Sequence, residues 1–275
     1  MTHIESAQTP DYLMGHSGWE IARLQLQATM LAPITRRLLH EAGLQRGMRV
    51  LDIGCGTGDV SVMIADIVGK QGKVVGIDRS DIAIKTARQR FGSYPNIQFA
   101  VGTLDDLLDN ERFDLAFGRY VLIHQPEPSE MLRQAAALVH PGGALAFHEI
   151  VLSDGFPTSP SSPLWDRLNR YYVQAFEKRL RHCDIAKRFV ACFAAVGLGT
   201  PKIISESIVG DGAASTLTPW FVETIRTLIP ELVASFGVNE EELAIDTLLD
   251  RLREESRTCC AQVSSSRQIG AWVTV

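Results

Sequence analysis

From about residue 48 onward, short apolar segments alternate with segments whose apolar residues recur at helical spacing. The short segments are rich in Val, Ile, Leu and Phe, which is typical of strands buried on both faces. They cover residues 48–53, 73–77, 97–101, 113–117 and 143–150. Helical spacing lies between them, as at Val60, Ile64 and Ile67. The alternation predicts an α/β fold in which helices cover a parallel sheet.

The second half of the chain departs from this pattern. Residues 153–160 are rich in Ser, Pro and Gly, which predicts a linker. The helix predicted after it is either an ordinary amphipathic surface helix or a lid over a substrate. The further elements that we predict are a helix at 186–196, a strand at 203–209, a mostly helical insertion at 217–257 and a final strand at 269–275.

The composition is that of a soluble globular protein, since 45% of the 275 residues are hydrophobic and 21% are charged. At roughly 100–200 residues per domain, this length allows one large domain or a core with additions. We divide the chain into an N-terminal helical cap, residues 1–46, and a domain of residues 47–275. Within this domain we expect helical lid insertions at about 151–182 and 210–267.

The net charge of −5 argues against a nucleic-acid partner, because such proteins usually carry a basic face. We find no apolar run of the roughly 18 residues that a membrane span needs, and no targeting segment. The five cysteines form no CxxC pair, so neither disulfides nor a metal site are expected. These features predict a cytoplasmic protein with a small-molecule partner. A homo-oligomer through the N-terminal or lid helices is an open alternative.

A glycine-rich loop joins the first predicted strand to the first predicted helix of the domain. Gly54, Gly56 and Gly58 allow the backbone to turn tightly and to approach a ligand without an intervening side chain. Asp78 ends the second strand 20 residues after Gly58, where a carboxylate can bind both hydroxyls of a ribose. The sequence therefore predicts a nucleotide-like ligand at this edge of the sheet.

The spacing of the glycines separates two kinds of nucleotide site. A pyrophosphate fingerprint, G-x-G-x-x-G, requires a glycine where this chain has Asp59. The order from Asp52 is D-x-G-x-G-x-G, which closely resembles motif I of the class I S-adenosylmethionine-dependent methyltransferases. The later segments 76–80, 113–119 and 138–143 resemble further motifs of that family. The resemblance implies a seven-stranded Rossmann-like sheet of order 3-2-1-4-5-7-6, in which the last strand is antiparallel.

The resemblance also implies which residues hold S-adenosyl-L-methionine. Asp52 would balance the ammonium of its methionine part, Asp78 would bind the ribose, and Arg79 would lie beside the adenine. The segment at the adenine edge departs from the family's pattern, because Thr103 replaces the usual Asp; its role could pass to backbone groups or to Asp105. The other cofactor-binding residues implied are Gly54, Cys55, Gly56, Gly58, Gly102, Leu104 and Arg119.

A methyltransferase acting on a hydroxyl or a carbon acid needs a proton acceptor near the transferred methyl group. His124 follows the fourth strand and is the first candidate, although it could equally be a polar residue of the loop. His148 and Glu149 lie at the carboxyl end of the fifth strand, where parallel sheets place ligands, and alternate across it. We expect at most one of them to face the site, and either could instead make a structural hydrogen bond.

Several residues outside the sheet are candidates for covering the substrate. The N-terminal Tyr12 and His16 could reach the site if their segment folds over the cofactor. Aromatic residues of the predicted insertions could wall an apolar pocket for a ring or terpenoid-like substrate, although each alone is more often a core residue. They are Tyr171, Tyr172, Phe176, Trp220 and Phe221.

Within its family the chain most resembles small-molecule methyltransferases of ubiquinone and menaquinone biosynthesis and their natural-product tailoring relatives. It lacks an Asn-Pro-Pro-Tyr-like element after the fourth strand, so we expect O- or C-methylation of a largely apolar molecule ahead of N-methylation. Two alternatives are a nicotinamide-dependent oxidoreductase, which Asp59 disfavours, and a protein or cyclase that binds the cofactor without transferring its methyl group.

Overall fold

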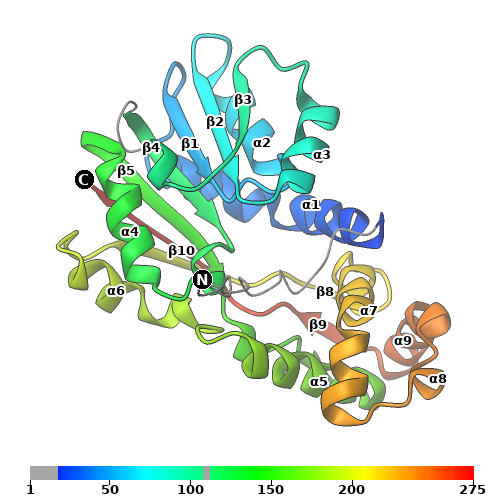
Figure 1. Cartoon of the computed structure of the whole chain (residues 1–275). Coiled ribbons are helices and arrows are strands. Elements are labelled where there is room, and N and C mark those ends of the chain that lie inside the picture. Colours follow the sequence, from blue (N-terminus) through cyan, green and yellow to red (C-terminus); the bar gives the residue numbers. More distant parts are fainter. Residues whose placement is uncertain (1–17, 108–111) are drawn as a thin grey trace, which may run out of the picture.

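A mostly parallel sheet forms the centre of the protein in the computed structural model, which describes residues 18–107 and 112–275 (Figure 1). Within these residues the sheet has seven strands in the order β3-β2-β1-β4-β5-β10-β7, and β10 is antiparallel to both of its neighbours. This order confirms the predicted one, in which the sixth and seventh strands are β7 and β10. The strands are β1 (Arg49–Ile53), β2 (Lys73–Asp78), β3 (Ile97–Val101), β4 (Phe113–Arg119), β5 (Val139–Ile150), β7 (Lys202–Glu206) and β10 (Gln268–Thr274).

Helices bury both faces of this sheet, which is why its strands are apolar at nearly every position. One face packs against α1 (Gly18–Glu41), α2 (Asp59–Val68) and α3 (Asp81–Phe91), and the other against α4 (Pro128–Ala137) and α6 (Phe189–Ala195). Successive side chains of β1 point to opposite faces of the sheet. Val50 clusters with Ile64 of α2, whereas Leu51 belongs to the core that contains Leu132 of α4 and Phe193 of α6.

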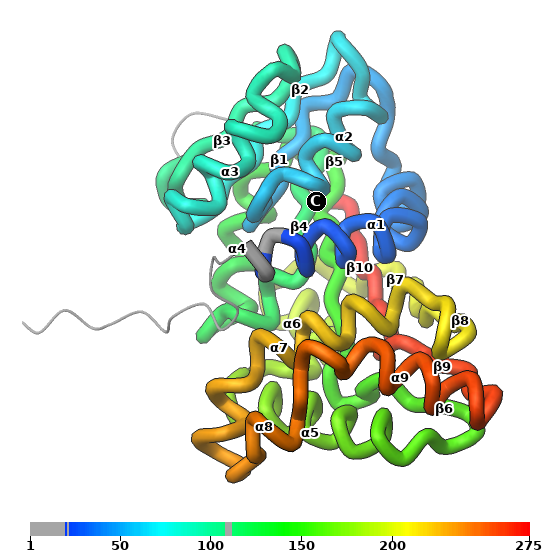
Figure 2. Tube along the Cα trace, turned by 90° about the vertical axis from the view of Figure 1, so that its right-hand side faces the viewer, coloured from blue at the N-terminus to red at the C-terminus, as the bar shows by residue number. Residues whose placement is uncertain are grey.

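A second group of helices lies beyond the β5 and β10 side of the sheet, in the lower half of Figure 2. It consists of α5 (Pro163–Arg179), α7 (Leu217–Phe236), α8 (Glu240–Leu243) and α9 (Ile245–Cys259). From here on we call this group of helices the cap; it is distinct from the N-terminal helical cap that the sequence predicts at residues 1–46. Helix α7 packs on α5, α9 and α1, and so links the cap to the helix at the start of the described chain. The predicted helical insertions thus form one unit in space.

The cap also contains strands that the hydrophobic pattern does not predict. A small antiparallel sheet of order β6-β9-β8 joins three distant segments, Thr158–Ser159, Gln262–Ser264 and Val209–Asp211. Residues 158–159 were expected in a linker, and 262–264 in a helical insertion. Strands of two or three residues are too short to show a periodicity, which is why the hydrophobic pattern does not reveal them.

The fifth strand begins before residue 143, where the hydrophobic pattern places its start, and so includes Pro141, Gly142 and Gly143. Helix α4 ends at Ala137, and β5 already begins at Val139. The strand contains an irregularity, since Phe113 of β4 pairs with Val139 while Leu115 pairs with Ala144. The three residues therefore lie in a bulged start of β5, and Gly142 takes the positive φ of 87° that the bulge requires.

Short 3-10 turns connect the longer elements, and three of them follow strands at the carboxyl edge of the sheet. They are η1 (Asp105–Leu107), η2 (Leu122–His124), η3 (Leu152–Asp154) and η4 (Ile185–Arg188). Strands β1, β2 and β4 end at Ile53, Asp78 and Arg119, and all three strands are parallel neighbours in the sheet. Their last side chains consequently meet at one edge, where open parallel sheets bind ligands.

Candidate active site

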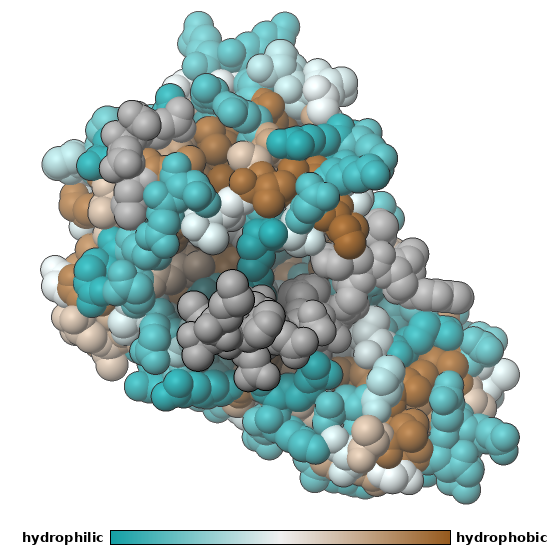
Figure 3. Space-filling model, in the orientation of Figure 1, coloured by the Kyte–Doolittle hydropathy of each residue, from teal (hydrophilic) through white to brown (hydrophobic). Residues whose placement is uncertain are grey.

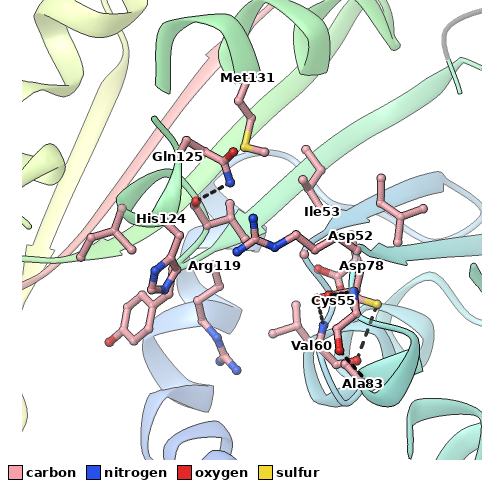
Figure 4. Close-up of a pocket in the computed structure, with 18 of the residues that line it drawn as sticks. Asp52, Ile53, Cys55, Val60, Asp78, Ala83, Arg119, His124, Gln125 and Met131 are labelled. Atoms are coloured by element: carbon pink, nitrogen blue, oxygen red, sulfur yellow. Dashed lines mark hydrogen bonds between the residues drawn. The ribbon is translucent and has the colours of Figure 1, made fainter. Parts of the chain in front are cut away.

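A cavity of about 510 Å³ lies at this edge, between the sheet and the cap. Its walls come from the ends of β1, β2 and β4, from α1 and α4, and from α5 and α7 of the cap. Figure 3 shows a recess between these two parts of the molecule. In Figure 4, Asp52, Cys55 and Asp78 lie on one side of the cavity, and His124 and Gln125 on the other. Its volume is that of a pocket for a small molecule.

The glycine-rich loop after β1 lines this cavity, as its sequence predicts. Gly54, Gly56 and Gly58 have φ values of 63°, 53° and 89°, a left-handed conformation that favours glycine. A Cβ atom at Gly54 would collide with the side chain of Val121, whereas a Cβ at Gly56 would meet nothing within 4 Å. Gly54 thus lets the loop pack against the segment after β4, and Gly56 leaves open space beside the backbone.

Two carboxylates that line the cavity stand on neighbouring strands. Asp52 is 1% exposed, and its Oδ2 accepts a hydrogen bond from Ser61 Oγ at 2.5 Å. Burial raises the pKa of Asp52 to about 7, because the charged form loses its hydration. Asp78 accepts hydrogen bonds from the backbone N–H of Gly56 and of Ser80, both at 2.9 Å. The Asp78 carboxylate therefore fixes the glycine loop to the end of β2.

The N-terminus of α2, where a pyrophosphate would lie in a dinucleotide site, carries a carboxylate. Both oxygens of Asp59 accept hydrogen bonds from Arg90 at 2.7 Å, and Arg90 also donates to the carbonyl of Thr57 at 2.9 Å. A phosphate here would face the negative charge of Asp59 and would have to displace it from Arg90. The structure thus adds a physical argument against the nicotinamide alternative.

The segment after β3 forms another side of the cavity. Gly102, Thr103 and Leu104 all line it, and so does Arg79 after β2. The backbone N–H and the hydroxyl of Thr103 donate to Asp106 Oδ2 at 2.7 and 3.1 Å. Because the hydroxyl proton is used in this way, the Thr103 oxygen retains a lone pair that can accept from an amino group.

Arg119, the last residue of β4, and Tyr120, which follows it, both line the cavity. Arg119 donates to the hydroxyl of Thr35 on α1 at 3.3 Å, and Thr35 lies 3.1 Å from Nδ1 of His148. The Tyr120 hydroxyl donates to Gln268 Oε1 on β10 at 2.5 Å. Nothing in the local sequence singles out Tyr120, because its position depends on contacts to residues far away in the chain.

His148 and Glu149 are fully buried in β5 and are not among the residues that line the cavity. Glu149 Oε1 accepts hydrogen bonds from the backbone N–H of Val121 and Leu122 at 2.8 and 2.7 Å. His148 contacts Thr35 and packs edge-on against the ring of Tyr120. Neither side chain lines the cavity, and both make structural hydrogen bonds behind its wall, which is the alternative that the sequence left open.

His124 is the catalytic candidate that lines the cavity. It ends the η2 turn, whose amide at Leu122 is bound by Glu149. Burial, together with the positive charges of Arg79 and Arg23, lowers the pKa of His124 to about 4. The imidazole is therefore neutral at pH 7 and has a nitrogen that can accept a proton.

The cap and α1 supply the rest of the lining. Tyr172 and Phe176 of α5 line the cavity as expected, while Tyr171 is half-buried and does not. Trp220 and Thr224 of α7 do so as well. Helix α1 contributes side chains that sequence reasoning missed, namely Arg23, Leu24 and Gln27. Their i, i+1 and i+4 spacing on one helix face is the signal that could have found them. Tyr12 and His16 lie outside the described residues.

Residues 44–191 match the family described as methyltransferase domain. The chain belongs to this family. Together with the strand order, the match confirms the predicted class I S-adenosylmethionine-dependent methyltransferase fold and its cofactor. The nicotinamide alternative is not favoured.

Curated relatives are similar in sequence to part of this chain. It is 28% identical over 126 residues to the demethylmenaquinone methyltransferase of Staphylococcus aureus (strain MRSA252), covering 46% of this chain and 51% of the relative. It is 30% identical over 135 residues to the ubiquinone biosynthesis O-methyltransferase of Coxiella burnetii (strain Dugway 5J108-111), covering 48% and 56%. The chain thus spans about half the length of the curated relatives it matches.

The fold extends over more of the chain than the sequence similarity does. A crystal structure of a Bacillus halodurans C-125 protein described as a methyltransferase matches with a TM-score of 0.54, covering 86% of this chain and 96% of that one. The two sequences are 15% identical, so this likeness concerns the fold alone. Among the described residues, no helix is both long and apolar enough to cross a bilayer. The homo-oligomer stays a prediction.

We expect replacement of Asp52 by asparagine to weaken binding of S-adenosylmethionine by about tenfold or more, the value of a hydrogen bond to a charged group. The wild-type carboxyl has a pKa of about 7, so its charged form, which attracts an ammonium, increases from pH 6 to pH 8. Affinity of the wild type should rise over this range more steeply than that of Asp52→Asn. Calorimetric titration measures both. The exposed Asp66→Asn is the control, and equal pH profiles for all three proteins would contradict the prediction.

The burial of Glu149 predicts how stability depends on pH. Its pKa is raised to about 8 in the folded protein, because burial disfavours the charge, whereas an exposed glutamate ionises near 4.5. Between these values the folded state binds the proton and the unfolded state does not. The contribution of the Glu149 carboxyl to the free energy of unfolding therefore falls as pH rises from about 5 to 8.

Replacement of Glu149 by glutamine keeps an oxygen for the two amides and removes the titration. We expect urea unfolding at several pH values to show that the wild type loses stability relative to Glu149→Gln as pH rises from about 5 to 8. Glu41→Gln, an exposed site on α1, should follow the wild type. A wild type that gains stability relative to Glu149→Gln above pH 5 would show that the carboxyl is ionised in the folded state.

Proposed function

We propose that the protein transfers a methyl group from S-adenosylmethionine to an oxygen or carbon atom of a small, largely apolar molecule. The observation that carries this proposal is the continuity of the cavity. It joins the glycine loop, Asp52 and Asp78 at one end to Tyr172 and Trp220 of the cap at the other. The names of the two relatives that methylate quinone precursors or demethylmenaquinone support an acceptor of this kind.

The residues at the first end fit the cofactor by their chemistry. Carboxylates at Asp52 and Asp78 suit an ammonium and a pair of ribose hydroxyls, and the open side of Gly56 allows close approach. Arg79 and Thr103 would lie along the adenine. Bound S-adenosylmethionine supplies an electrophilic methyl group on a positively charged sulfur.

The chain itself has three tasks in such a reaction. The sheet edge and the cap orient the acceptor and exclude water, because the cavity lies between them. Arg119 and Tyr120 form its middle wall, and Glu149 holds the backbone that follows them. His124, neutral at pH 7, would accept the proton that an acceptor hydroxyl or acidic carbon releases.

Cofactor choice is tested by thermal unfolding with S-adenosylmethionine, S-adenosylhomocysteine, NAD and NADP. A ligand at 100 times its dissociation constant stabilises a folded protein by roughly 2.7 kcal/mol. We expect this stabilisation from S-adenosylmethionine and S-adenosylhomocysteine. We expect none from NAD or NADP, because the carboxylate of Asp59 would face their pyrophosphate. Stabilisation by NAD or NADP alone would refute the proposal.

Methyl transfer is tested by the formation of S-adenosylhomocysteine from a panel of phenols, hydroquinones and terpenoid alcohols. We expect His124→Ala to lower the rate with a productive acceptor by about 10²-fold or more, the usual contribution of a general base. His140→Ala, an exposed histidine at the start of β5, is the matched control. Tight binding of the cofactor with no transfer to any acceptor would favour the non-methylating alternative. A His124→Ala variant with full activity would remove His124 from the mechanism.

A further inference from the structure

Tyr120 holds a backbone conformation that tyrosine rarely adopts. Its φ is 58°, in the left-handed region, where a side chain costs about 1 kcal/mol or more. Such a residue persists only where its surroundings fix it. Here the Tyr120 N–H donates to the carbonyl of His148 at 2.9 Å, and the next two amides donate to Glu149. The strained residue is thus fixed on its own backbone and on the segment that follows.

The side chain of Tyr120 is fixed as well. Its hydroxyl donates to Gln268 Oε1 at 2.5 Å, and Gln268 in turn donates from Nε2 to the carbonyl of Ser266 at 3.0 Å. This second bond sets the orientation of the Gln268 amide, so that its oxygen faces Tyr120. The ring lies edge-on to His148 with centroids 5.8 Å apart. Three contacts of its own, to His148 through its backbone and its ring and to Gln268 through its hydroxyl, therefore hold this residue that lines the cavity.

These contacts fix the hydrogen-bonding polarity of the Tyr120 hydroxyl. A tyrosine hydroxyl has one proton and can both donate and accept. The hydroxyl proton of Tyr120 is donated to Gln268, so toward any further group the Tyr120 oxygen can only accept a hydrogen bond. Burial also raises the pKa of Tyr120 far above its ordinary value, which keeps the phenol neutral. A ligand group that meets this oxygen favourably must carry a proton of its own.

The position of Tyr120 in the cavity indicates which ligand it meets. It follows Arg119, at the cofactor side, and precedes the turn that carries His124. The aromatic side chains of Tyr172, Phe176 and Trp220 line the cavity beyond it. These rings pack on one another and on Phe156, with centroids about 5 Å apart, as in the pair Phe156–Trp220 at 5.2 Å. An aromatic wall of this kind suits a flat apolar ring.

We propose that Tyr120 is a specificity-determining and positioning residue, whose hydroxyl oxygen accepts a hydrogen bond from a hydroxyl group on an aromatic acceptor. The proposal deepens the proposed function and rests on it. An accepting Tyr120 oxygen favours a phenol or hydroquinone over a molecule that offers only ether or carbonyl oxygens. The hydrogen bond would hold the acceptor oxygen between the cofactor residues and His124.

The test uses binding, so that it does not depend on the natural acceptor being known. The protein is saturated with S-adenosylhomocysteine and titrated with 2-naphthol or with 2-methoxynaphthalene, which lacks the hydroxyl proton. We expect the wild type to bind 2-naphthol about threefold to tenfold more tightly, the range of one net hydrogen bond. In Tyr120→Phe this preference should fall below about twofold. Tyr171→Phe, the same change on a residue that does not line the cavity, should keep it.

A second variant tests polarity without removing the tyrosine. In Gln268→Leu the Tyr120 proton is released and can donate to an ether oxygen. We expect 2-methoxynaphthalene to bind more tightly to Gln268→Leu than to the wild type, while 2-naphthol keeps its affinity. This outcome distinguishes a role of Tyr120 in recognition from misfolding of the variant, because misfolding would weaken the binding of both ligands.

Two results would overturn the inference. One is a wild type that binds 2-naphthol no more tightly than the ether, and the other is a Tyr120→Phe variant with an unchanged preference. Failure of the proposed function looks different, because it is seen as absent binding of S-adenosylmethionine or absent methyl transfer. If the protein transferred no methyl group but its preference for 2-naphthol still depended on Tyr120, the site for a hydroxylated ring would be supported and the proposed reaction rejected.

Discussion

The burial of the parallel sheet on both faces constrains everything else in this protein. Polar side chains cannot lie in the middle of such strands without a partner, so those that could serve a ligand are found where the strands end. Asp52, Asp78 and Arg119 all stand at this edge. Because neighbouring parallel strands end together, side chains 26 to 67 residues apart in the chain line one cavity.

Carboxyl groups of acidic side chains fix the loops that leave this edge. Asp78 binds the backbone of the glycine loop after β1, and Glu149 binds the backbone after β4. Asp59 does the same for the start of α2 through Arg90, which also reaches the carbonyl of Thr57. Backbone groups cannot be exchanged by substitution, so this mode of support holds the loops in place whatever side chains they carry. It explains how Tyr120 can keep a left-handed conformation.

The cap provides the other half of the cavity, and it is assembled from segments far apart in sequence. The small sheet joins residues near 158, 210 and 263, and α7 packs against α1 from the start of the described chain. Trp165 stacks on Phe221 with centroids 4.8 Å apart and donates to the carbonyl of Phe156 at 2.6 Å. These buried contacts hold α5 and α7 together, and thereby position the aromatic side chains that line the acceptor end.

The sequence alone determined the α/β class and the cofactor loop, because these depend on local patterns: apolar periodicity, and glycines whose spacing argues against a pyrophosphate site. The strand order came from the resemblance of its motifs to a known family. The sequence could also propose His124 from its place after the fourth strand. It could not tell that Glu149 turns its carboxylate to the amides of Val121 and Leu122, since strand alternation leaves the partner of a buried acid unknown. Tertiary contacts likewise decided the role of Tyr120 and the short strands of the cap. The physical reason is that a hydrogen bond between residues 148 positions apart, such as that from Tyr120 to Gln268, leaves no local trace in the sequence.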